Sequence, residues 1–183
     1  MHLLFPASCP TDQPGYFSAS TGCYHVAAYL MNYTSGISVS RLQCAFQPFH
    51  LLLTAPFQYC STLGMHLVEI NDVDENAAVA EIMTAVGMNS DRGAGRYHTY
   101  LGMDSLSGVD SNDYTWYPSG LPHDSDHFSC WYHGEPELWN KEGCVGFFRD
   151  SGAGFTSREA GCTAGRVWVD IYCSRKENVM CEL

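Results

Sequence analysis

The sequence predicts a single α+β domain braced by disulfides. A strand-like run, His66–Ile70, is followed at once by a helix-like run, and two further strand-like runs, Val167–Cys173 and Val179–Leu183, close the chain. Nine cysteines are many for 183 residues. A chain of this length holds one domain with a sizeable core.

The composition narrows the function classes. The formal net charge of −11 and nine scattered Lys and Arg residues argue against a nucleic-acid partner. The sequence contains no stretch of about 20 apolar residues, which is the length that a membrane-spanning helix needs. The cysteine spacing is neither that of zinc ribbons nor that of a redox pair, so a disulfide framework in a secreted protein is the better interpretation. Residues 1–8 are too short for a signal peptide, and we interpret them as the remnant of one.

Local signals order the elements along the chain. Pro14-Gly15, between Cys9 and Cys23, predicts an N-terminal hairpin. Residues 59–64 are typical of a helix end with a glycine cap. Asp72 with Glu75 predicts a helix start. Apolar residues then recur at helical spacing until Gly87 ends the run, and they are Ala78, Val79, Ile82, Met83 and Val86.

The second half contains the run Tyr100-Leu101-Gly102-Met103, and its residues 107–117 and 118–129 are polar and turn-rich, which predicts loops. Tryptophans stand at positions 116, 131 and 168. Trp131 is followed by the run Gly134-Glu135-Pro136-Glu137, and Trp168 begins the run Trp168-Val169-Asp170. Taken together, these motifs resemble those of the C-type lectin-like domain in its long form, which begins with a hairpin.

This resemblance covers residues 9–183 except for the segment 35–58. It implies two helices that flank small antiparallel sheets, with a long irregular loop region that binds calcium and ligand. Residues 51–58 can be encoded by a pyrimidine-rich run ending in CAG, as in a translated splice acceptor, so a retained intron is one interpretation of the segment. A genuine loop insertion is the other, because surface loops lengthen at small free-energy cost.

The resemblance also implies the cysteine pairing. The family template pairs Cys60 with Cys181 and Cys144 with Cys173, and the hairpin of the long form is closed by Cys9–Cys23. We propose a fourth bridge, Cys130–Cys162, because both residues flank the calcium loops; two separate thiols are the alternative. Cys44 is then left over, within the 35–58 segment.

One calcium site is implied by the same resemblance, with Glu135, Glu137, Glu142 and Asp170 as ligands. Calcium takes about six to eight oxygen ligands, and a cis bond before Pro136 would turn the flanking carboxylates toward one ion. The sugar-binding members carry Asn or Asp at the position of Glu137 and Asn at that of Val169. A vestigial loop that has lost its cation is the alternative.

The expected function is therefore a secreted, calcium-dependent carbohydrate-recognition module with altered or weakened sugar specificity, in innate defence by family analogy. Its partners would be glycans or glycoproteins, held by the same four acidic residues. The alternative is a lectin-like module that binds a protein surface and no longer binds sugar. No catalytic motif stands in the chain, so an enzyme is not expected.

Overall fold

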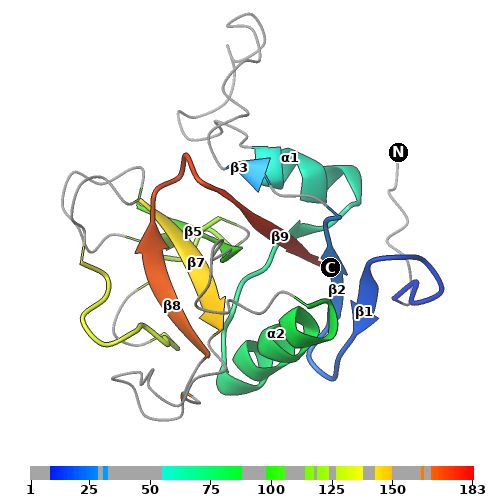
Figure 1. Ribbon diagram of the computed structural model, residues 1–183, viewed down its shortest axis with the longest axis horizontal. Coiled ribbons are helices and arrows are strands. Elements are labelled where there is room, and N and C mark those ends of the chain that lie inside the picture. Colours follow the sequence, from blue (N-terminus) through cyan, green and yellow to red (C-terminus); the bar gives the residue numbers. More distant parts are fainter. Residues whose placement is uncertain are drawn as a thin grey trace, which may run out of the picture.

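The structure is a computed structural model that describes residues 9–28, 31–32, 55–87, 98–105, 114–117, 119–123, 127–137, 143–149, 162 and 166–183. Figure 1 shows two helices and a twisted set of strands between them. The α+β class predicted from the sequence is confirmed. The elements, in chain order, are β1 (Tyr16–Ser18), β2 (Cys23–Val26), β3 (Met31–Asn32), α1 (Ala55–Thr62), β4 (His66–Leu67), α2 (Val73–Ala85), β5 (Thr99–Asp104), β6 (Thr115–Trp116), β7 (Cys144–Arg149), β8 (Arg166–Ile171) and β9 (Lys176–Glu182).

The strands join in the order β1-β2-β9-β5-β7-β8, with β3 and β4 also paired to β9 and β6 paired to β5. The β5–β9 pair is parallel, and the other pairs are antiparallel. The expected strand at residues 66–70 is shorter than predicted, since β4 ends at Leu67. Val68 nevertheless bridges two strands, because its N–H donates to Met180 and its carbonyl accepts from Gly102.

Helix α2 begins and ends, and helix α1 ends, where the local signals predict. Asp72 caps α2, since its Oδ1 accepts from the N–H groups of Asp74 and Glu75, each at 2.9 Å. Gly87, at φ 75°, follows its end. Helix α1 begins at Ala55, so residues 55–58 of the proposed insert are helical, and Phe57 packs edge-on against Tyr117. Residues 35–54, and with them Cys44, lie outside the described part, as do residues 1–8.

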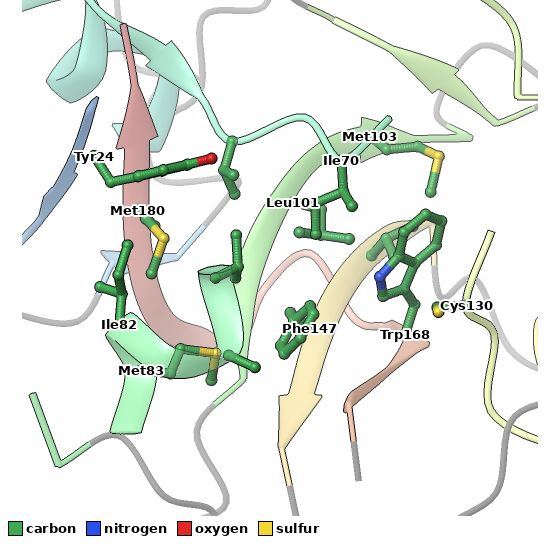
Figure 2. Packing of buried hydrophobic residues seen from close by; sticks show 14 of the residues in the cluster. Tyr24, Ile70, Ile82, Met83, Leu101, Met103, Cys130, Phe147, Trp168 and Met180 are labelled. Atoms are coloured by element: carbon green, nitrogen blue, oxygen red, sulfur yellow. The ribbon is translucent and has the colours of Figure 1, made fainter. Parts of the chain in front are cut away.

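Two clusters of buried side chains lie on opposite faces of the central strands. The first contains Leu101, Phe147 and Trp168 and is covered by Ile82 and Met83 of α2, as Figure 2 shows. The second contains Tyr100, Ile171 and the α1 residue Cys60. This separation follows from the period-two alternation of strands. Residues next to each other on β8 therefore face different environments.

Four disulfides brace this arrangement: Cys9–Cys23, Cys60–Cys181, Cys130–Cys162 and Cys144–Cys173. They are the same four pairs as those expected above, with Cα–Cα distances of 5.2 to 5.8 Å. Cys60–Cys181 ties α1 to β9. Three strands were missed, since β3 and β7 were not predicted and β6 lies within the expected 107–117 loop.

Candidate functional site

The candidate site lies where the segment 130–137 runs beside β8. The Trp168 N–H donates to the Cys130 carbonyl at 2.8 Å, and the Tyr132 N–H donates to the Trp168 carbonyl at 2.9 Å. Trp131 and Trp168 thereby form a parallel bridge. This register brings the residues that follow Trp131 alongside the residues that follow Trp168, and Asp170 is among the latter.

A turn then directs the chain back toward β8. The Glu135 N–H donates to the Tyr132 carbonyl at 2.9 Å, and Gly134 has a φ of 105°. Glycine adopts this conformation without the steric cost that a Cβ would bring. The Glu135–Pro136 bond is cis, the isomer that the resemblance to C-type lectin-like domains implies.

The carboxyl groups of Glu135 and Asp170 meet at this turn and share a hydrogen bond. Burial raises the pKa of Glu135 to about 8, and the hydrogen bond and negative charge of Asp170 act in the same direction. In the opposite direction, the Glu137 N–H donates to Glu135 Oε2 at 3.1 Å and favours the ionised form. Two carboxyl groups so close together favour a proton or a cation between them.

Solved structures share this arrangement of elements. The mouse scavenger receptor C-type lectin carbohydrate-recognition domain has 19% identity and a TM-score of 0.59, over 96% of this chain and 95% of that chain. The C-type lectin domain of murine dendritic cell inhibitory receptor 2, in complex with N-glycan, has 18% identity and a TM-score of 0.59, over 96% and 98%. A Ca²⁺-dependent type II antifreeze protein in its Ca²⁺-free form has 15% identity and a TM-score of 0.56, over 92% and 97%.

The chain adopts the C-type lectin-like fold. The likeness lies in the structure, because the sequence matches none of the protein-family models and none of the curated proteins compared with it. In the C-type lectin-like fold of this chain, the paired carboxyl groups of Glu135 and Asp170 lie at the loop that the sequence singled out.

The four expected ligands are not all brought together. Glu137 is exposed, and within the described ranges no three His, Cys, Asp or Glu side chains lie close enough to hold one metal ion. Glu142 lies outside those ranges. Val169 is half-buried and packs against the second cluster, so its side chain has a packing role and offers no oxygen to a cation.

The donor chemistry of the Glu135–Asp170 pair fits a hard cation such as calcium. Carboxylate oxygens are ligands that calcium prefers, and a buried acidic pair gains from a positive partner. Asp170 is 6% exposed, so its carboxyl group is held in place by the surrounding strands. The pair would contribute part of a calcium coordination shell, and Glu137 and Glu142 are the remaining expected ligands.

The sequence did not reveal the role of His123, which lies within a stretch expected to be a polar loop. Its Nε2 accepts a hydrogen bond from the Trp131 indole N–H at 3.2 Å, and its ring centroid lies 5.8 Å from that of Trp168. Trp116 and Trp168 also meet edge-on, at 5.8 Å. Trp131 is 5% exposed and belongs to the first core cluster. This aromatic cluster fixes the strand segment from which Glu135 follows.

Proposed function

We propose that the chain is a calcium-dependent carbohydrate-recognition module with altered or weakened sugar specificity. The observation that carries the proposal is the hydrogen-bonded pair of Glu135 and Asp170. Glu135, Glu137, Glu142 and Asp170 would hold one calcium ion and accept hydrogen bonds from sugar hydroxyls. A bound calcium ion would supply coordination positions that two hydroxyl oxygens can share.

Sugar choice would follow from what these side chains lack. An Asn side chain both ligates with its carbonyl and donates with its NH₂ group, whereas an ionised Glu137 only accepts and Val169 does neither. Hydrogen bonds that involve charged groups contribute roughly 1.5–3 kcal/mol each. We therefore expect weaker binding of monosaccharides than in a site that carries Asn at both positions.

The partners and the compartment follow from the same proposal. The murine receptor domain of similar fold holds an N-glycan, which supports glycans or glycoproteins as partners. Four disulfides are typical of an oxidising compartment, so the module would be secreted. By analogy with the fold family, it would have no catalytic activity and would serve in innate defence. In the described ranges, no helix has both the length and the apolar character needed to cross a bilayer. The net charge of −11 disfavours nucleic acid.

Calcium calorimetry on the purified chain tests the site, with a paired variant, Glu135→Gln with Asp170→Asn, and a matched control, Asp12→Asn. Asp12 is exposed and far along the chain from the site. We expect calcium binding in the wild type and the control and none in the paired variant. A glycan array run with and without chelator then tests sugar recognition. If the paired variant still gives a heat of calcium binding, the ion binds at another site and the proposed ligands are wrong.

A protein-binding module without calcium is the second candidate. Two observations favour it. Glu137 is exposed and, among the described residues, forms no cluster of three side chains that could hold a metal ion. Val169 packs its apolar side chain against the second cluster. Binding to a protein partner that chelator leaves unchanged, with no heat on calcium titration, would favour this candidate over the first.

A further inference from the structure

A groove separates the β1–β2 hairpin from α2, on a part of the molecule that the proposed calcium site does not use. It has a volume of about 510 Å³ and is lined by Phe17–Ser20 on one side and by one stripe of α2 on the other. Figure 1 shows β1 beside α2 in this region. The two elements diverge here because the hairpin turns away at Ala19, whose N–H donates to the Gly22 carbonyl.

Small side chains keep the groove open. The α2 stripe carries alanine at positions 77, 78 and 85, and the larger Ile82 is buried in the floor. Phe17 and Ala19 pack against the first core cluster, so the hairpin side is held in place. The alanines leave space over the helix for small apolar groups of an occupant.

The charge on this surface is of one sign. Asp74 and Glu81 line the groove and are both exposed, and no Lys or Arg is found among the described residues that line it. Seven residues separate the two carboxylates along α2, which is about 10 Å at the rise of a helix. Together with the net charge of −11, this pattern opposes nucleic acid, an anionic membrane and a second acidic copy of the chain.

We propose that this groove docks an extended, cationic segment of a partner protein. An extended polyproline II chain has three residues per turn and rises about 3.1 Å per residue, so Lys or Arg side chains three positions apart lie on one face, about 9 Å apart, close to the spacing of Asp74 and Glu81. Small apolar residues between them would face the alanine floor. Charge complementarity selects the occupant, and the apolar floor adds contact area.

The test uses a short capped peptide with Lys at every third position and Ala between, titrated into the ¹⁵N-labelled chain. We expect amide shifts confined to residues 17–20 and 74–85. Both carboxylates form exposed charge pairs with the peptide, so neutralising them with Asp74→Asn and Glu81→Gln should weaken binding about two- to thirtyfold. Asp12→Asn makes the same kind of charge change outside the groove lining and should leave the affinity unchanged.

A second variant, Ala77→Leu, keeps both charges and fills the groove, and it should also weaken binding. A peptide with Glu in place of Lys should give no shifts. The proposal is overturned if the Lys peptide causes no shifts, if its shifts lie around Glu135 and Asp170, or if both groove variants bind it as tightly as the wild type.

Discussion

The indole N–H of Trp168 donates to Oδ1 of Asn76 at 3.0 Å, between two fully buried side chains. The Asn76 amide nitrogen in turn donates to the Arg166 carbonyl at 3.1 Å. One side chain of α2 thus satisfies a donor and an acceptor of β8. This contact sets the position of the strand that presents Asp170 to Glu135.

Replacing Asn76 by Ala should destabilise the fold by about 1–3 kcal/mol, because the Trp168 indole N–H would remain buried without its acceptor. Denaturant unfolding followed by tryptophan fluorescence measures the change. The same substitution at Asn71, which is exposed, provides the matched control. Equal stability losses in the two variants would show that the buried amide has no special role.

Stability should fall as the pH rises through neutrality, because of Glu182. This side chain is 8% exposed, and burial raises its pKa to about 7 from the ordinary value of 4.5. The charges of Glu75 and Glu69 add to the shift, while hydrogen bonds from the Glu69 N–H and from Tyr24 oppose it. The folded state therefore holds a proton that the unfolded state has lost, between about pH 4.5 and 7.

The contribution of Glu182 is thus fully present below about pH 4.5 and is lost as the pH rises through about 7, by up to about 3 kcal/mol. Gln is uncharged at every pH, so Glu182→Gln should match the wild type in acid and be more stable than it at pH 8. Urea unfolding across this range measures the difference. Parallel stability curves for the two proteins would contradict the prediction.

Gly146 in β7 should not tolerate Ala. A Cβ there would lie 2.8 Å from His98 Cβ and 2.9 Å from Ile171 Cδ1. Overpacking of this kind typically costs 1–3 kcal/mol, so Gly146→Ala should lower the thermal midpoint by several degrees. Gly22→Ala is the control, since its nearest contact would lie at an ordinary 3.5 Å. A Gly146→Ala protein as stable as the control would refute this account.

The disulfides should differ in how much they contribute to the free energy of unfolding, according to the length of the loop that each one closes. Cys60–Cys181 spans 121 residues and Cys9–Cys23 spans 14. Loop-entropy arguments give about 4–5 kcal/mol for the first and about 3 kcal/mol for the second. Paired Cys→Ala variants, compared by calorimetry, should show the larger loss for Cys60–Cys181. A larger loss for Cys9–Cys23 would mean that native contacts, rather than loop length, determine how much stability each disulfide contributes.

Much of the fold could be predicted because the signals were local. The Asp72 cap, the helical repeat that follows it and Gly87 specify α2 without reference to the rest of the chain. Strand β7 was missed because Gly146 interrupts an otherwise β-like run, and glycine weakens a strand prediction. The reason for that glycine is the close approach of His98 and Ile171, which only the assembled sheet reveals.

The site was harder to predict than the fold. The motif pointed to Glu135 and Asp170, and the structure joins them through the pairing of Trp131 with Trp168. The outward position of Glu137 depends on the path of the turn, which the sequence does not specify. Likewise, His123 lies among polar neighbours in sequence, so its place between tryptophans depends on contacts made across the sheet.

Strand β9 pairs with β2, β3, β4 and β5, so strands from both halves of the molecule meet on it. Residues 176–182 are nevertheless the last strand of this fold to be translated. A nascent chain that stops before them leaves four strands without a common partner. Folding of this domain should therefore wait until β9 has left the ribosome, and a premature stop codon just upstream of Lys176 should yield a protein that quality control degrades.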